Sequence, residues 1–194
     1  MNRRKPFVVV VAWAILAGGG VVASGQQQAQ RDRRPPGQFE LPPLASRLQI
    51  SSSAFPATGP IPSKYTCDGQ GLNPPLTFAS IPPKTQSLVL IMDDPDIPKG
   101  LTPTGVFDHW LIWDLPADSP GFAEGAGKGG INGTGQAGYI GPCPPDREHR
   151  YFFKLFALDT RLTSAKIGNK KDLESAMEGH VIQRAELIGR YQRK

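Results

Sequence analysis

A histidine and a tyrosine, His149 and Tyr151, follow a turn that contains three prolines, residues 141–145. Proline fixes φ and cannot donate a backbone hydrogen bond, so the turn is stiff, and Gly141 at its start allows a ligand to approach the backbone closely. Side chains alternate along a strand, so an extended chain puts His149 and Tyr151 on one face. An imidazole N–H and a phenol O–H can both donate hydrogen bonds to one small anion. The pattern marks the turn and the two side chains beyond it as a candidate functional site.

Three more polar residues lie at the ends of apolar runs, where a rigid scaffold usually presents functional groups. Asp94 and Asp96 follow one such run and flank Pro95, and His109 begins another. Taken one at a time, these residues also fit structural roles, with the aspartates capping turns and Tyr151 in the core.

The elements that position these residues are mostly strands. Apolar runs bounded by turn residues predict buried strands, and a period of two predicts one strand with two distinct faces. One helix is expected at about 171–178, with Gly179 able to end it. With 22 glycines and 20 prolines, the predicted fold is a mainly β, antiparallel β-sandwich with one or two short helices. The expected strands are "SLVLIMDDPD" (87–96), "HWLIWDLP" (109–116), "HRYFFKLFALD" (149–159) and "RAELIGRY" (184–191).

The N-terminal part of the chain predicts export. Residues 1–25 read as a secretory signal, because basic residues precede an apolar stretch that ends in small residues. An uncleaved membrane anchor is the alternative, since residues 7–24 give 18 positions without a charge. Residues 26–44 are rich in Gln, Arg and Pro and predict a disordered tether. The folded domain is expected at 45–194, in the periplasm or outside the cell.

Net charge gives little support for nucleic-acid binding. The chain carries +5, but residues 1–44 hold six Arg or Lys against two acidic residues, which leaves the domain near +1. No run of basic residues interleaved with aromatics appears within the domain sequence. The motif "GAGKGG" at 125–130 matches the glycine spacing of a dinucleotide site but lacks the strand before it and the helix after it, so it predicts a mobile surface loop.

Cys67 and Cys143 are the two cysteines of the chain. An exported protein folds in an oxidising compartment, so a disulfide between them is the favoured interpretation. Closing a loop of this length stabilises a fold by on the order of 4 kcal/mol in the chain-entropy account. Two buried free thiols, or a zinc site completed by histidines, are the alternatives, although neither cysteine has a second ligand at short spacing.

Long motifs recur along the chain in a fixed order: "DDPDIP", "FDHWLIWDLP" and "GPCPPDREHRYFFKLFALD". Together they resemble the phosphatidylethanolamine-binding protein family, and within it the bacterial branch of Raf-kinase-inhibitor-like proteins. "IPSKYTCDGQGLNPPLTF" and "AMEGHVIQRAELIGRY" are also similar to that branch, so the resemblance spans about residues 48–191. It implies two antiparallel sheets and a small pocket at the strand ends, which in this family accepts phosphate, acetate or a phosphorylated headgroup.

The resemblance also implies binding roles for single residues. The matches are to the first Asp of a D-P-D motif, the first pocket histidine, the paired prolines of the turn, and the His and Tyr of an H-R-Y motif. Phe107 stands where many relatives have a tryptophan, and "DREHRY" replaces a glycine after the prolines, so we expect a different pocket rim. A C-terminal tyrosine that lines the pocket in eukaryotic members has no matching position. A carboxylate repels the phosphate that the resemblance implies, so we expect Asp94 to accept a hydrogen bond from an imidazole, which orients the ring and favours its protonated form. The predicted ligand-binding residues are Asp94, His109, Gly141, Pro144, Pro145, His149 and Tyr151.

The expected function is weak, pH-sensitive binding of a small anion such as phosphate or a phosphorylated headgroup, with a regulatory role as one option. A hydrolase using Asp94, His109 and His149 is an alternative, but the sequence has no G-x-S-x-G motif and no H-x-x-x-H or carboxylate cluster for a metal. We therefore expect a non-enzyme without cofactor or metal. Docking to a protein partner such as a kinase or protease, as in some relatives, is the other alternative, and peripheral contact with phospholipid headgroups fits the ligand class.

Overall fold

The computed structural model describes residues 48–127, 129–163 and 166–194. The predicted signal at 1–25 and tether at 26–44 lie outside these residues, as does the expected start of the domain at residue 45. Within the described ranges, no helix has the length and apolar character needed to cross a membrane.

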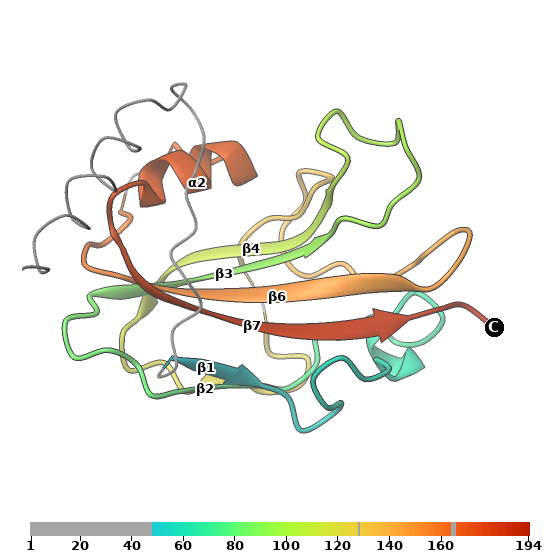
Figure 1. Cartoon of the computed structure of the whole chain (residues 1–194), viewed down its shortest axis with the longest axis horizontal. Helices are drawn as coiled ribbons and strands as arrows, with labels where there is room; N and C mark the ends of the chain where they lie inside the picture. Colours follow the sequence, from blue (N-terminus) through green and yellow to red (C-terminus); the bar gives the residue numbers. More distant parts are fainter. Residues whose placement is uncertain (1–47, 128, 164–165) are drawn as a thin grey trace, which may run out of the picture. The chain divides into compact units, whose positions relative to one another are not determined.

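Two antiparallel sheets form the fold (Figure 1). The larger sheet has the strand order β4-β3-β6-β7, and the smaller has the order β1-β2-β5. Helix α2 lies on one side of the larger sheet, and β1 and β2 lie on the other (Figure 1). The predicted antiparallel β-sandwich with little helix is confirmed. The elements are β1 (Gln49–Ser51), the 3-10 helix η1 (Ser63–Tyr65), β2 (Leu76–Ala79), β3 (Ser87–Asp94), β4 (Phe107–Pro116), β5 (Gly121–Phe122), β6 (His149–Leu158), α2 (Lys170–Met177) and β7 (Val181–Tyr191).

The burial of each strand explains its sequence pattern. All eight residues of β3 are buried, which requires a nearly continuous apolar run because both faces of the strand are covered. Strand β6 buries every second side chain from His149 onward, and on its other face only Phe156 and Leu158 are buried. The predicted period of two, with His149 and Tyr151 on one face, is confirmed.

Two apolar clusters hold the layers together. The first joins the two sheets and includes Phe78 of β2 and Leu90 of β3. The second joins the larger sheet to α2 and includes Ile91 of β3 and Leu173 of the helix. Neighbouring residues of β3 therefore pack into opposite cores, which is the alternation expected of a strand.

Helix α2 begins and ends at residues typical of helix termini. The Asn169 side chain accepts a hydrogen bond from the backbone N–H of Asp172 at 3.0 Å, which caps the first turn. Gly179, just beyond the helix, has a φ of 79°, a left-handed conformation that glycine adopts without strain. The predicted helix at about 171–178 is confirmed, with a shift of one residue.

A disulfide joins Cys67 to Cys143, with 5.4 Å between the two Cα atoms, as favoured from the sequence. The Cys67 N–H also donates to the Pro142 carbonyl at 3.1 Å. A Cβ atom on Gly141 would lie only 2.9 Å from the Tyr65 carbonyl oxygen. The close approach expected of a ligand at Gly141 is thus made by the chain's own backbone, which holds the proline turn against the segment that follows η1.

The glycine-rich segment around residue 127 is a loop, as predicted, and it packs tightly on the core. A Cβ atom on Gly127 would lie 2.4 Å from the Trp110 ring. The indole N–H of Trp110 donates to the Gly129 carbonyl at 3.1 Å. Close packing against Trp110 explains the need for glycine at position 127.

Candidate anion-binding site

Most of the predicted site residues lie at one end of the larger sheet. Because its strands are antiparallel, the end of β3 lies beside the beginnings of β4 and β6, and β6 begins beside the end of β7. The Cα partners at this end are Asp94 with Phe107, and His149 with Tyr191. Asp94 and His149 are 55 residues apart in the sequence and are brought into contact by this register.

His149 is held between two carboxylates. Its Nδ1 lies 2.7 Å from Oδ2 of Asp94, and its Nε2 lies 2.8 Å from Oδ1 of Asp146. The His149 side chain has no exposed surface, whereas the side chain of Asp146 is 42% exposed. The expectation that Asp94 accepts a hydrogen bond from an imidazole agrees with this geometry, and the imidazole belongs to His149.

The two contacts set a condition on the hydrogen atoms of the His149 ring. A carboxylate only accepts hydrogen bonds, and a neutral imidazole has one N–H, so both contacts are hydrogen bonds only when the ring is doubly protonated and positive. The hydrogen bond from His149, supported by Arg147, holds the pKa of Asp146 below its usual range. Asp146 is therefore an ionised acceptor at neutral pH, and it faces the Nε2 atom of His149.

The second aspartate of the D-P-D motif fixes the end of β3. Asp94 Oδ1 accepts a hydrogen bond from the backbone N–H of Asp96 at 2.8 Å. The Asp96 carboxylate accepts from Nε and Nη2 of Arg150 at 2.7 and 2.8 Å, and this pairing lowers the pKa of Asp96. Asp96 thus ties the end of β3 to β6, and Asp94 is preorganised to hold His149.

His109 is neutral near pH 7 in this environment. Its Nδ1 donates to the Ile140 carbonyl at 2.7 Å, and its ring meets the edges of Phe107 and Tyr151 at centroid distances of 4.9 and 5.2 Å. Burial lowers the pKa of His109 below its ordinary value. With Nδ1 protonated and the ring neutral, Nε2 is an acceptor. At neutral pH His109 therefore offers an acceptor, and not a donor, at Nε2.

The Tyr151 hydroxyl is buried and unpaired. The side chain is fully buried, and no residue in the described ranges forms a hydrogen bond with its oxygen. Burial and the charge of Asp94 raise the pKa of Tyr151, so the hydroxyl keeps its proton and remains a donor. A buried polar group without a partner costs roughly 1–3 kcal/mol. The hydroxyl therefore favours a bound acceptor at this position.

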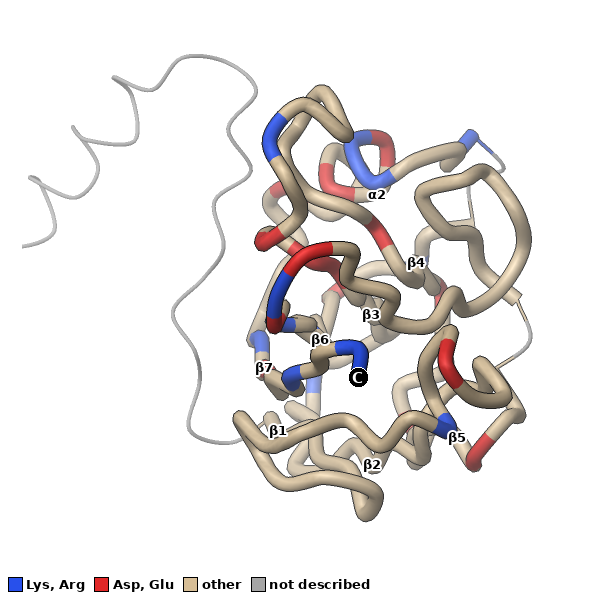
Figure 2. The backbone as a smooth tube through the Cα atoms, turned by 90° about the vertical axis from the view of Figure 1, so that its right-hand side faces the viewer, with Lys and Arg blue, Asp and Glu red and all other residues tan. Residues whose placement is uncertain are grey.

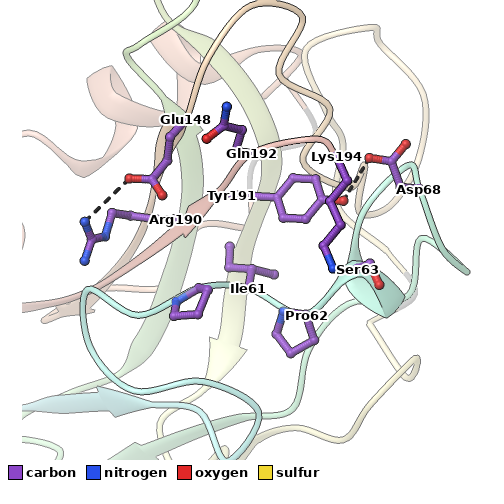
Figure 3. A pocket seen from close by; sticks show the side chains of 10 residues that line it. Ile61, Pro62, Ser63, Asp68, Glu148, Arg190, Tyr191, Gln192 and Lys194 are labelled. Atoms are coloured by element: carbon purple, nitrogen blue, oxygen red, sulfur yellow. Dashed lines mark hydrogen bonds and ion pairs between the residues drawn. The ribbon is translucent and has the colours of Figure 1, made fainter.

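Two pockets open at the same end of the molecule. The smaller, of about 230 Å³, lies between the proline turn and the basic C-terminal segment. The larger, of about 620 Å³, includes Tyr191, whose hydroxyl donates to Asp68 at 2.8 Å (Figure 3). Figure 2 shows acidic and basic residues close together in the loops around the C-terminus. The smaller pocket is lined by Pro144, Pro145, Asp146, Arg147, Gln192, Arg193 and Lys194.

Comparison with known proteins settles the family. A family model described as phosphatidylethanolamine-binding protein matches residues 51–192. The chain belongs to this family. It is 46% identical over 149 residues to a UPF0098 protein of Chlamydia pneumoniae, a match that covers 75% of this chain and 99% of the relative. A UPF0098 protein of Pyrococcus horikoshii is 37% identical over 199 residues, which cover 96% of this chain and 88% of the relative.

Solved structures agree with the membership in the phosphatidylethanolamine-binding protein family. A family homologue from Chlamydia trachomatis superposes with a TM-score of 0.72 at 42% identity, covering 77% of this chain and 100% of the other. YbcL of Escherichia coli, described as a member of the mammalian family, gives a TM-score of 0.68 at 25% identity with the same coverage. The resemblance seen in the motifs is confirmed.

Within this family fold, the predicted site residues take unequal positions. Four of them meet at the end of the larger sheet, and two line the smaller pocket. Gly141 lies against the backbone of Tyr65 and Thr66. The four that meet are Asp94, His109, His149 and Tyr151, and the two that line the pocket are Pro144 and Pro145.

Sequence reasoning missed two residues of this region. Asp146 belongs to "DREHRY", the segment that the family resemblance marks only as the replacement of a glycine, and its place three residues before His149 was the available signal. Tyr191 ends β7 opposite His149 and lines the larger pocket. Tyr191 is a tyrosine near the C-terminus at this end of the sheet. From the sequence alone, no residue could be matched to the C-terminal pocket tyrosine of eukaryotic family members.

The histidine nitrogens of the site differ in their engagement. The Nε2 atom of His149 faces the Asp146 carboxylate and is not free to activate a nucleophile. The Nδ1 atom of His109 is bonded to a backbone carbonyl. Within residues 48–127, 129–163 and 166–194, no group of three or more His, Cys, Asp or Glu side chains is arranged to hold a metal ion.

Proposed function

We propose that this family member is a non-catalytic binding protein for small anions, with phosphate and phosphorylated headgroups as the ligand class. The observation that carries the proposal is the buried Tyr151 hydroxyl beside His149, which has no partner among the described residues. A phosphoryl or sulfuryl oxygen is an acceptor for this donor, and an N–H of the neighbouring His149 ring is a second donor to the same anion.

The smaller pocket, whose lining residue Asp146 contacts His149, has a suitable charge and a stiff wall. Three basic residues and one carboxylate line the smaller pocket. Two prolines form its wall, and the neighbouring Cys143 is bonded to Cys67. Because the turn is constrained by the proline rings and by the disulfide, little ordering is required when an anion enters.

Replacing Tyr151 by Phe tests the proposal because it removes one oxygen atom. That oxygen has no partner in the described structure, so the melting temperature should stay unchanged or rise. A hydrogen bond to a charged group contributes about 1.5–3 kcal/mol, so the affinity for sulfate should fall about tenfold or more. Calorimetric titration with sulfate at pH 7 measures both proteins, and sulfate avoids the ionisation of phosphate in this range.

Tyr65→Phe is the matched control. The Tyr65 hydroxyl donates to Glu124 at 2.7 Å, and this bond raises the pKa of Tyr65 to about 12. Its loss should lower stability and leave the sulfate affinity unchanged. Equal sulfate affinities in the wild-type protein and Tyr151→Phe would reject the proposed site.

The source of the anion is a separate question, because free phosphate and a lipid headgroup share the same chemistry. Titrations with inorganic phosphate, O-phosphoethanolamine and vesicles that contain phosphatidylethanolamine separate these sources. Binding of the first two without vesicle association indicates a soluble ligand. Phosphorus NMR should recover the O-phosphoethanolamine unchanged after incubation, whereas release of phosphate supports the hydrolase instead.

We also propose that the protein acts outside the cytoplasm, on the strength of the signal predicted at residues 1–25. Intact-mass analysis of protein from the cell envelope should show the loss of those residues. Recovery of full-length chain from the cytosol contradicts this proposal without affecting the anion site.

A further inference from the structure

The carboxylate of Asp146 makes the contacts that a bound anion is expected to make. Its Oδ1 lies 2.8 Å from Nε2 of His149, and its Oδ2 lies 2.8 Å from Nη1 of Arg147. One anionic group therefore bridges an imidazole and a guanidinium at the wall of the smaller pocket. It occupies the one nitrogen of His149 that Asp94 does not hold.

We infer that Asp146 is an internal competitor for the anion site, and that an external anion binds by displacing the Asp146 carboxylate from His149. The inference rests on the proposed function, because it concerns the same donor. A site that is open for only part of the time loses apparent affinity in proportion to that fraction. Asp146 therefore sets the anion affinity of this protein.

The two carboxylates around His149 differ in their freedom to move. Asp94 is 4% exposed and accepts hydrogen bonds on both oxygens, one of them from the backbone. Asp146 is 42% exposed and lies in the turn before β6, and its second partner, Arg147, is 57% exposed. Rotation about the side-chain bonds of Asp146 is sufficient to release His149, whereas Asp94 stays fixed.

A displaced Asp146 carboxylate remains among cations. Arg147 lies beside it and is anchored by an Nη2 hydrogen bond to the Asp96 carbonyl at 3.0 Å. Arg193 and Lys194 line the same pocket. Because opening leaves the carboxylate in water beside positive groups, no charge is stranded in an apolar environment, and exchange with an incoming anion is feasible.

Asp146→Ala tests the inference, with Glu148→Ala as the matched control. Glu148 belongs to the same exposed turn and carries the same charge, but its carboxylate pairs with Arg190 at 3.5 Å. Sulfate affinity should rise on the order of tenfold in Asp146→Ala. This is the gain expected if the His149 donor is free of the Asp146 carboxylate about one tenth of the time in the wild-type protein. In Glu148→Ala it should change by less than about twofold, because only a screened charge is lost.

Acetate separates competition from simple repulsion. Removal of a competitor raises the affinity for every anion by the same factor, whereas removal of a repelling charge favours the doubly charged sulfate over acetate. The full chain and both variants are therefore titrated with each anion. The imidazole nitrogen NMR signals of His149 in the ligand-free proteins report the contact directly.

Equal gains for sulfate and acetate in Asp146→Ala, with little change in Glu148→Ala, support the inference. Similar gains in both variants, or a larger gain for sulfate than for acetate, overturn it in favour of general repulsion. Unchanged affinities in Asp146→Ala overturn it and leave the proposed function intact. If none of the proteins binds either anion, the proposed function fails and the inference with it. Unchanged His149 signals in Asp146→Ala disprove the contact itself, whatever the affinities.

Discussion

Asp93 and Asp94 are neighbours on β3 that serve opposite faces of the larger sheet. Both side chains are buried, but their partners differ. Asp94 accepts from the imidazole of His149, on the face that packs against the smaller sheet. Asp93 accepts from Lys154 at 2.8 Å and from Lys170 at the start of α2. One carboxylate thus meets a titratable ring, and the other meets two lysines.

The Asp93 side is a closed ionic cluster that fixes α2 to the sheet. Lys170 also pairs with Asp108 at 3.3 Å. Burial alone lowers the pKa of Lys170, but the charges of Asp93 and Asp108 outweigh it and raise the pKa overall, so the lysine stays charged. Burial raises the pKa of Asp108. Oxygen Oδ1 of Asp93 has no hydrogen-bond partner in the described ranges, yet its other oxygen already meets both ammonium groups.

The difference shows what turns a buried aspartate into part of a binding site. An ammonium group is a compact charge at the end of a flexible chain. It pairs with the carboxylates that it contacts and does not pass their effect on to a further group. An imidazole has a second nitrogen on the far side of the ring, so His149 carries the effect of Asp94 outward to Asp146 and the pocket. Four substitutions or treatments can break or sharpen this contrast.

The largest expected effect is the loss of stability when the disulfide is removed. This bond holds the proline turn, which lies on the same side of the larger sheet as Asp94. Replacing Cys67 and Cys143 by Ala should lower the free energy of unfolding by about 4 kcal/mol, since the 76-residue separation closes a long loop. Urea unfolding measures this change. Thiol titration of the denatured, unreduced wild-type protein should find almost no free thiol, and two reactive thiols per chain would reject the disulfide.

Asp93→Asn should give the next largest effect, and it should act on stability alone. Lys154 and Lys170, whose side chains are 22% and 19% exposed, lose their buried counter-ion. Such a loss lowers the free energy of unfolding by about 3 kcal/mol in pairs of this kind. The exposed pair of Asp159 with His180 gives the control, because Asp159→Asn should cost less than about 1 kcal/mol. Sulfate titration of folded Asp93→Asn should match the wild-type protein, and a weaker affinity would mean that the two faces are coupled.

Asp94→Asn is the counterpart on the other face. The substitution keeps the shape of the side chain but removes the charge that orients His149 and favours its protonated form. We expect sulfate binding to weaken by about 1.5 kcal/mol, the smaller value for a hydrogen bond to a charged group. Calorimetry on Asp93→Asn and Asp94→Asn, at a temperature where both are folded, compares the two directly. Equal affinities in the two variants would show that the anion site lies elsewhere.

Much of the fold could be predicted because burial imposes a local pattern. The alternation from His149 to Leu158, the unbroken apolar run of β3 and the cap at Asn169 are each visible within about ten residues. The hydrogen bond from an imidazole to Asp94 could be inferred once the family resemblance placed a phosphate beside that carboxylate, since the two negative charges repel each other.

The parts that could not be predicted depend on contacts between distant segments or on turn geometry. Nothing local indicates that Lys170 reaches Asp93 across 77 residues. The direction of the Asp146 side chain depends on how the proline turn is fixed, not on its three-residue spacing from His149. The neutral state of His109 arises from its burial and from the Ile140 carbonyl, 31 residues away.

The smallest expected effect is a pH dependence carried by His109, whose pKa is also influenced by the charges of Asp94, Asp93 and His149. Burial lowers its pKa in the folded protein, so the unfolded chain binds the proton more readily. The stability that His109 contributes is therefore complete above the unfolded pKa of about 6.5 and is lost as the pH falls through the lowered, folded value. Between pH 7.5 and 5.5 the wild-type protein should lose up to about 1 kcal/mol.

His109→Asn isolates this term, because the Asn amide can donate to the Ile140 carbonyl in place of Nδ1 and does not titrate. The difference in unfolding free energy between the two proteins should shrink as the pH falls from 7.5 to 5.5. Only the wild-type protein must keep a histidine ring unprotonated at a pH where the unfolded chain would bind a proton. Sulfate should reverse part of the wild-type loss, because a protonated Nε2 becomes a donor near Tyr151 and the anion favours that state. Parallel pH profiles for the two proteins, with and without sulfate, would show that His109 neither titrates in this range nor meets the anion.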